Sequence, residues 1–276
     1  MAVRTSSKSM HGVADRATDS DAFEYTARAG FAASGVLHLL VAFIIGQLAF
    51  TGAGGNADQS GALATLASQT GGAIVLWVAA AGLAALGLWR VAEAVMGAKP
   101  RERSGRSDGS SAWKRVKSLA LAVVNFAIAL SAARFAMGSG QSSSRQNAGY
   151  SAQLMQSGWG KALLIAVGIG VAAVGAYHVY KGASEKFLDE LRVSGGTFVT
   201  ATGVTGYVAK GLVLAGAGIL VVVATLQADP SKASGLDAAV KTLGQAPFGK
   251  VLLILAAIGI AAFGVYSFIR ARYSRM

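Results

Sequence analysis

The 276-residue chain is strongly apolar: 53% of its residues are hydrophobic, 14% are charged, and the mean hydropathy is +0.50. A soluble domain ordinarily carries about a quarter charged residues, so this composition excludes a typical soluble enzyme. The absence of cysteine excludes disulfides, thiolate metal ligands and cysteine nucleophiles. The net charge is +12, but the basic residues gather at the ends of apolar segments, as topology signals do, and we do not expect nucleic-acid binding.

The apolar residues are grouped into six long segments that follow a polar tail, residues 1–22. Each segment has about 21 residues, enough for a helix to cross the roughly 30 Å hydrocarbon core of a bilayer. We predict transmembrane helices at 30–50, 73–93, 118–138, 161–181, 206–227 and 250–270. The tail shows no pattern of a cleavable signal peptide. The expected fold is an all-α integral membrane protein.

The lysines and arginines predict the orientation of these helices. Nineteen of the 25 fall on the side that holds both termini and the second and fourth loops. The loop 99–117 alone has seven. By the positive-inside rule, both termini are therefore expected in the cytoplasm, with the chain in the cell (inner) membrane. The basic loop should also attract anionic lipid headgroups, by about 1 kcal/mol per residue.

A unit of about 88 residues occurs three times along the chain. In each copy a glycine that opens the second helix stands fifteen residues before another glycine, and the pairs are Gly72 and Gly87, Gly160 and Gly175, Gly249 and Gly264. We divide the chain into repeat 1 (23–99), a basic loop with repeat 2 (100–190) and repeat 3 (191–276). Each copy is a two-helix hairpin that begins and ends on one side, so the copies are parallel and related by a pseudo-threefold axis along the membrane normal.

The first helix of each hairpin repeats less closely. Gly30 and Gly35 match Gly206 and Gly211, but the second copy has Lys117 and Ala122 at these places. Since small residues allow close helix packing, we expect the first helix of the second copy to pack more loosely.

Small residues recur at i, i+4, i+7 on the second helix of every copy, and therefore along one face. They are Ala80, Ala84 and Gly87, then Gly168, Ala172 and Gly175, then Ala257, Ala261 and Gly264. A second row contains Gly82, Gly170 and Gly259. Such faces let helix backbones approach closely in lipid. We predict that the second, fourth and sixth spans pack tightly against one another.

The outer loops also repeat. Leu66, Leu154 and Leu243 each lie six residues before the glycine that opens the next span. They belong to short amphipathic stretches at 62–68, 151–156 and 237–243. We predict that each stretch forms a one- to two-turn helix in the outer membrane interface.

These features together resemble a known family. The chain opens with Ala27-Arg28-Ala29-Gly30-Phe31, carries Ala-Ala-x-Gly-x-Tyr at 172–177 and 261–266, and closes with Arg270-Ala271-Arg272-Tyr273. In this it resembles the actinobacterial membrane proteins grouped as domain of unknown function 1206, over roughly residues 23–275. The resemblance implies the triplicated hairpin fold but no chemistry, because that family carries no established activity.

A few polar residues inside the spans are candidates for function, because ionisable groups in a membrane segment are costly. They are His38, Asn125 at the aligned place, Arg90, Glu93 and His178. His38 could serve as a proton-relay or ligand position, but we favour an interhelical hydrogen bond. Arg90 could line an inward-facing vestibule with His178 and Lys210 and pair with Glu93, but we favour snorkelling to the headgroups.

No constellation of these residues indicates catalysis. The three histidines lack metal-ligand spacing, and the carboxylates lie mostly in tails and loops. We therefore expect a non-enzymatic structural or accessory membrane protein without cofactor or metal, packing against a membrane partner or itself. The alternative is a small transporter or channel for a small or lipid-like solute along the pseudo-threefold axis, since parallel repeats occur in transporters.

Overall fold

The computed structural model describes residues 21–52, 54–96, 111–192 and 195–274. All six predicted spans are helical, and each helix is long and apolar enough to cross a membrane. They are α2 (Asp21–Thr51), α4 (Gly72–Met96), α5 (Ser111–Ala136), α7 (Gly158–Ala183), α8 (Thr197–Leu226) and α10 (Gly249–Tyr273). The predicted all-α architecture of three two-helix repeats is confirmed. Most of the polar tail and most of the basic loop lie outside the described residues.

The loop between the two spans of each repeat contains a short helix: α3 (Gln59–Ala67), α6 (Ser143–Leu154) and α9 (Leu236–Gln245). Two of them match the predicted stretches closely, whereas α6 begins eight residues before the predicted stretch 151–156 and ends within it. The Asp58 carboxylate accepts a hydrogen bond from the Gly61 N–H and so caps α3, and the Ser142 hydroxyl caps α6 through the Arg145 N–H. Such caps satisfy amides that the first helical turn leaves without partners. The position of these helices in the membrane interface stays a prediction.

The glycine that opens each even-numbered span has a steric reason. A Cβ on Gly72 would lie 1.8 Å from the Leu66 carbonyl oxygen, and one on Gly160 would lie 2.0 Å from that of Leu154. At Gly249 the obstacle is the Gly244 carbonyl oxygen, 2.1 Å away. Each outer helix therefore turns so sharply into the next span that no side chain fits at the corner.

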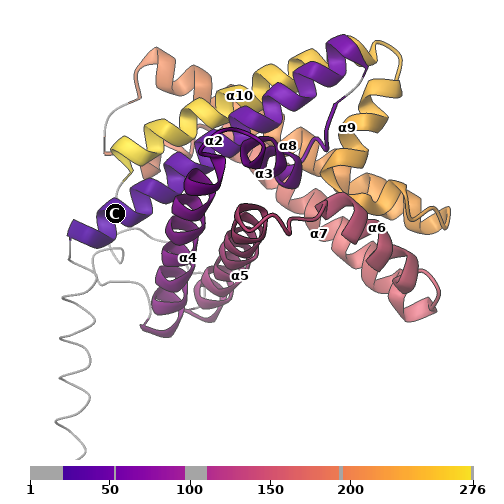
Figure 1. The fold of residues 1–276 in the computed structure, drawn as a ribbon, viewed down its shortest axis with the longest axis horizontal. Coiled ribbons are helices and arrows are strands. Elements are labelled where there is room, and N and C mark those ends of the chain that lie inside the picture. Colours follow the sequence, from indigo (N-terminus) through magenta and orange to yellow (C-terminus); the bar gives the residue numbers. More distant parts are fainter. Residues whose placement is uncertain (1–20, 53, 97–110, 193–194, 275–276) are drawn as a thin grey trace, which may run out of the picture.

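The spans pack in three pairs that join neighbouring repeats. α4 packs on α5, α7 on α8, and α10 on α2, so that the last pair joins the third copy to the first (Figure 1). This order corrects the expectation that the second, fourth and sixth spans pack against one another, because α4, α7 and α10 form no substantial interface among themselves. Each packs instead on the first span of the next copy.

Glycines on both partners explain this choice. Gly168 of α7 lies against Gly218 of α8, and Gly264 of α10 lies against Gly35 of α2. Two backbones come this close only where both helices lack side chains, and the first spans supply the second set of small residues. In the remaining pair, Gly87 of α4 packs against the Phe126 ring of α5 instead.

The nine small residues predicted for packing mostly lie in helix interfaces or apolar clusters. Gly87, Gly168, Gly175 and Gly264 would each bring an added Cβ against a neighbouring helix, and the backbone of Ala172 lies against Gly218. Ala80 is buried in one apolar cluster, Ala257 and Ala261 pack on another, and Ala84 is partly buried.

The two spans of a single repeat pack together in the first copy (α2 on α4) and in the third (α8 on α10), but α5 and α7 form no comparable interface. Figure 1 shows the α4–α5 pair set apart from the α7–α8 pair. The looser packing expected of the first helix of repeat 2 is therefore confirmed.

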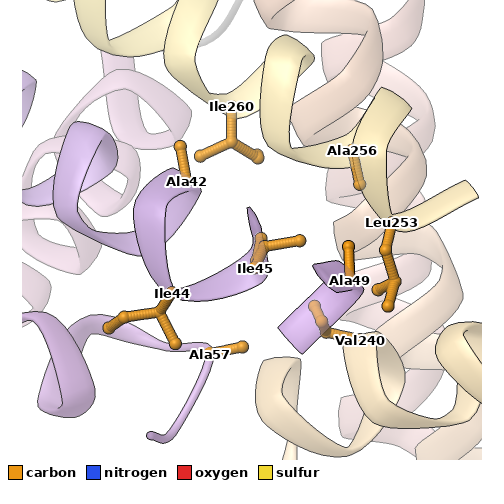
Figure 2. Packing of buried hydrophobic residues seen from close by; sticks show 9 residues of the cluster. All are labelled: Ala42, Ile44, Ile45, Ala49, Ala57, Val240, Leu253, Ala256 and Ile260. Carbon is orange, nitrogen blue, oxygen red and sulfur yellow. The ribbon is translucent and has the colours of Figure 1, made fainter. Parts of the chain in front are cut away.

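The end of the bundle that holds α3, α6 and α9 has an apolar core between the first and last copies. Ile44 and Ile45 of α2 are almost fully buried against Val240 of α9 and Leu253 and Ile260 of α10 (Figure 2). Burying a side chain of this size stabilises a fold by about 1.5–3 kcal/mol where the alternative is water.

Polar contacts also join the three outer loops to one another, in a cycle. The Ser144 hydroxyl donates to Asp58 at 2.6 Å, the Asn147 amide donates to the Ser234 carbonyl at 3.2 Å, and the Ala57 N–H donates to Asp237 at 2.8 Å. The first loop is thus tied to the second, the second to the third, and the third to the first. Asp58 and Asp237 are buried, as partnered polar groups can be.

The opposite end of the bundle brings together the start of α2, the loop between α7 and α8, and the end of α10. The Arg192 N–H donates to the Tyr273 carbonyl at 2.8 Å, and the Arg28 guanidinium donates to the Arg272 carbonyl at 2.8 Å. These segments therefore lie at the same end of the bundle. The distribution of basic residues predicted this arrangement for the fourth loop, which joins α7 to α8, and for the two ends of the chain.

Candidate functional site

Several polar and aromatic side chains of α2, α7, α8 and α10 meet at the end of the bundle that holds the α7–α8 loop. We call Phe187, Tyr207, Phe263 and Tyr266 the aromatic cluster. All four are buried, and the hydroxyl of Tyr266 donates to the Phe187 carbonyl at 3.1 Å. Phe187 comes from the loop, Tyr207 from α8, and Phe263 and Tyr266 from α10.

The rings of this cluster contact one another edge to face or offset, as aromatic pairs prefer. Centroids lie 5.5 Å apart for Phe187 and Tyr207, 5.2 Å for Phe187 and Tyr266, and 5.2 Å for Tyr207 and Phe263. The Phe187 ring fits because residue 203 is glycine: a Cβ there would lie 2.2 Å from the ring. The loop between the second and third copies is therefore locked into the bundle.

Two histidines adjoin the same cluster from opposite sides. His38 of α2 lies 4.8 Å from the Phe263 ring, and His178 of α7 lies 5.8 Å from the Tyr207 ring, between centroids. The Nδ1 of His38 contacts the Ser34 carbonyl at 2.7 Å, one turn back on its own helix. The interhelical hydrogen bond expected for His38 is thus replaced by an intrahelical one, and its contact across helices is between rings.

Two lysines lie over rings of the cluster. Lys210 Nζ is 3.9 Å from the Phe263 centroid, and Lys181 Nζ is 4.9 Å from that of Tyr207. Cations at this distance are attracted to the ring faces, by about 2 kcal/mol where water is excluded. Lys210 was considered as part of a polar vestibule, but the geometry places it against an apolar ring.

The acidic residue Glu190 pairs with two of the cations at this end. Glu190, in the short helix η2 (Leu188–Glu190), accepts a hydrogen bond from Lys181 at 2.5 Å and lies 3.2 Å from Arg270. Burial alone would raise the pKa of Glu190, but the nearby charges of Arg270 and Lys181 hold this pKa below its usual value. Lys181 and Arg270 occupy equivalent places in repeats 2 and 3, so Glu190 links two copies.

The predicted candidate residues thus divide into two groups. His38 and His178 converge on the aromatic cluster. Asn125 lies on α5, which packs against α4 and α3, and Arg90 lies near the end of α4. Glu93 belongs to α4, but its side chain is outside the described residues, so the ion pair with Arg90 stays a prediction. The five candidates therefore do not form one site.

The sequence did not single out the residues of the α7–α8 loop that help to organise this end. Phe187 and Leu191 are fully buried, and Glu190 carries the ion pairs, yet the segment reads as a polar connection. One signal was available in the sequence: Asp189 and Glu190 are acidic, although the segments predicted on the same side of the membrane are rich in arginine and lysine. Chemically, this arrangement ties α2, α7, α8 and α10 together through rings and ion pairs.

Comparison with known proteins gives the same threefold division. Residues 29–97, 116–185 and 205–274 each match the model of a family described as Domain of Unknown Function (DUF1206). The "Uncharacterized protein YxxB" of Bacillus subtilis (strain 168) is 29% identical over 257 residues, covering 90% of each chain. No solved structure matches. The actinobacterial source expected from the resemblance is not tested by these matches.

Proposed function

Because the chain belongs to the DUF1206 family, whose description gives no activity, we propose its function from its own geometry: it is a non-enzymatic structural or accessory protein of the cell membrane. It crosses the bilayer six times, with both termini in the cytoplasm. It acts by packing laterally against a membrane protein partner or a second copy of itself, and it needs no cofactor.

The observation that carries this proposal is the use of polar and aromatic residues at both ends of the bundle. At one end the three outer loops are hydrogen-bonded in a cycle, through Asp58, Asn147 and Asp237. At the other, Phe187 and Leu191 fill the space between α8 and α10. Residues that could have served transport or catalysis instead hold helices together, as expected of a scaffold.

We do not favour the alternative of transport along the pseudo-threefold axis. A polar pathway would need intramembrane groups that face one another, but His38 bonds to its own helix and Lys210 lies over an aromatic ring. A shallow hollow of 490 Å³ runs along the first turns of α8, and its lining residues are Gly195, Thr197, Thr200, Ala201, Val204 and Thr205. Neither His38 nor His178 lines it.

The cytoplasmic placement of the termini is supported by which segments share an end of the bundle. The start of α2, the α7–α8 loop and the end of α10 meet there. These segments carry Arg28, Lys186, Arg192 and Arg272, whereas the outer loops carry few basic residues. The positive-inside rule then assigns that end to the cytoplasm.

The proposal is tested by photo-cross-linking in native membranes. A photoreactive residue replaces Val123 or Leu130, which lie exposed on α5, and a matched control replaces the buried Ala129 on the same helix. We expect each exposed position to give one discrete adduct, either with a second copy or with one other membrane protein, and the control to give none. Adducts with lipid alone from both exposed positions, together with a monomer after mild detergent extraction, would contradict the proposal.

A further inference from the structure

The second repeat differs from the other two at the contact between its own two helices. Gly30 of α2 packs on Leu86 of α4, and Gly206 of α8 packs on the backbone of Phe263 of α10. The equivalent residue of α5 is Lys117, which is exposed. A lysine cannot provide the close approach that a glycine allows, so α5 stands away from α7 where the other hairpins close.

The side of α7 that corresponds to this contact in the other repeats is exposed as well. A Cβ on Gly259 would lie 2.0 Å from the Cβ of Ala209, and Gly82 lies close to Gly30, whereas the equivalent Gly170 has nothing within 4 Å. The next positions along this face follow the same pattern. Val174 is 50% exposed where its counterpart Phe263 is 5% exposed, and Tyr177 is 54% exposed where Tyr266 is fully buried.

We name the space between these two faces the α5–α7 seam, bounded by Lys117 on α5 and by Gly170, Val174 and Tyr177 on α7. On α7 these residues stand at i, i+4 and i+7 and so share one side of the helix. Since α7 ends at Ala183 and a helix rises 1.5 Å per residue, Gly170 lies roughly 20 Å from that end. The α7 side of the seam is therefore lined by a glycine, a valine and a tyrosine from the middle of the helix toward that end.

Positive charge gathers where the seam reaches the end of the bundle. Arg115 and Lys117 are both exposed in the first turn of the α5 span. On the α7 side, Lys186 lies just beyond the helix with its Nζ 2.6 Å from the Tyr180 hydroxyl. Of the acidic residues in this loop, Glu190 is already paired with Lys181 and Arg270, and Asp189 lies near Lys186, so that Lys117 is the cation left to a lipid. The mouth of the seam thus offers cations above an apolar wall.

We propose that the α5–α7 seam binds one anionic phospholipid, with its phosphate at Lys117 and one acyl chain along Gly170 and Val174. Basic pockets between transmembrane helices bind anionic headgroups, and a nearby cation contributes about 1 kcal/mol of attraction. The acyl chain takes the place that the chain's own first helix takes in repeats 1 and 3. The charge at the mouth favours a lipid over an apolar helix of a protein partner. This site does not depend on whether a protein partner exists.

The test is native mass spectrometry of the purified full-length protein, titrated with phosphatidylglycerol or with phosphatidylcholine of the same acyl chains. We expect one phosphatidylglycerol to be held more tightly than phosphatidylcholine. Lys117→Gln should weaken this binding about fivefold, the effect of losing one headgroup cation, and Lys117→Arg should retain it. The matched control is Lys161→Gln, which removes an exposed lysine at the other end of α7.

A second pair of variants tests the acyl chain. Gly170→Leu fills the seam and should abolish retention of the lipid, whereas Gly216→Leu, in equally open space on α8, should leave it unchanged. Equal binding of both lipids, or no effect of Lys117→Gln, would overturn the proposal. Because the chain has no cysteine, Gly170→Cys gives a further check: disulfide-linked dimers in native membranes would assign the seam to a second copy instead.

Discussion

Gly175 of α7 and Gly211 of α8 face each other so closely that a Cβ added to either would lie 2.6 Å from the carbonyl oxygen of the other. Gly35 and Gly264 repeat this relationship between α2 and α10, at 3.0 and 3.1 Å. Two of the three interfaces between one copy and the next, α7–α8 and α10–α2, are therefore made by backbone against backbone.

A methyl group at such a contact should separate the helices. We expect Gly175→Ala to lower the free energy of unfolding by about 1–3 kcal/mol, as overpacking does, measured by thermal unfolding in detergent. Gly216→Ala is the matched control: its site is open, and alanine favours a helix over glycine. Equal melting temperatures of the two variants would contradict the packing described here.

The difference between repeats gives a second prediction at equivalent positions. Gly259→Ala should destabilise the protein because its Cβ would collide with that of Ala209, whereas Gly170→Ala should be neutral or slightly stabilising because nothing lies within 4 Å. The measurement is again thermal unfolding, with both variants in the same detergent. Similar losses at the two glycines would mean that α5 closes on α7 in solution.

The sequence predicted the six spans and the threefold repeat because a bilayer imposes a length and a polarity on every segment that crosses it. It also predicted the looser α5, from the Lys117 and Ala122 that stand in place of the two opening glycines. It did not predict which helices pair. A small-residue row shows that a helix can be approached, but the partner depends on a matching row elsewhere, such as Gly211 and Gly218 opposite Gly175 and Gly168.

The candidate site was predicted only in part, for a related reason. His38 and His178 stand out as polar residues in apolar spans, and both do reach the aromatic cluster. Phe187 and Glu190 gave little signal, because a loop residue becomes buried through tertiary contacts that leave no periodic pattern. The ion pairs of Glu190 depend on Arg270 of α10, which lies far from it in sequence.

Glu190 makes stability depend on pH. Its pKa is lowered in the folded protein, so the charged form is stabilising above the ordinary glutamate pKa of about 4.3, and this stabilisation is lost as the pH falls through the lowered pKa. Glu190→Gln should therefore cost about 1 kcal/mol at neutral pH, and its melting temperature should approach that of the parent as the pH falls below the lowered pKa of Glu190.

The control for Glu190→Gln is Glu185→Gln, which changes an exposed residue of the same loop. It should leave both the melting temperature and its pH dependence unchanged. A difference between the parent and Glu190→Gln that stays constant down to the most acidic condition would show that Glu190 contributes by shape and not by charge.

The cycle of outer loops predicts an energetic coupling between Asp58 and Ser144. Asp58→Asn removes an acceptor from a buried hydrogen bond and should cost about 1–3 kcal/mol, and Ser144→Ala removes the other end of the same bond. The double variant should lose less than the sum of the two single losses. Ser151→Ala removes a different hydrogen bond, from the Ser151 hydroxyl to the Ala233 carbonyl. Its loss of stability should therefore add in full to that of Asp58→Asn. Additive losses of stability for Asp58→Asn and Ser144→Ala would rule out the hydrogen bond between the first two loops.

The orientation of the bundle can be measured directly because no native cysteine interferes. Lys186→Cys lies in the α7–α8 loop and Ser231→Cys in the loop between α8 and α9, and both positions are exposed. If the basic end faces the cytoplasm, a membrane-impermeant maleimide added to intact cells should label Ser231→Cys and reach Lys186→Cys only after permeabilisation. The opposite labelling would invert the protein in the membrane. It would place Lys117 at the outer surface, and the seam would then have to recruit its anionic lipid from the outer leaflet.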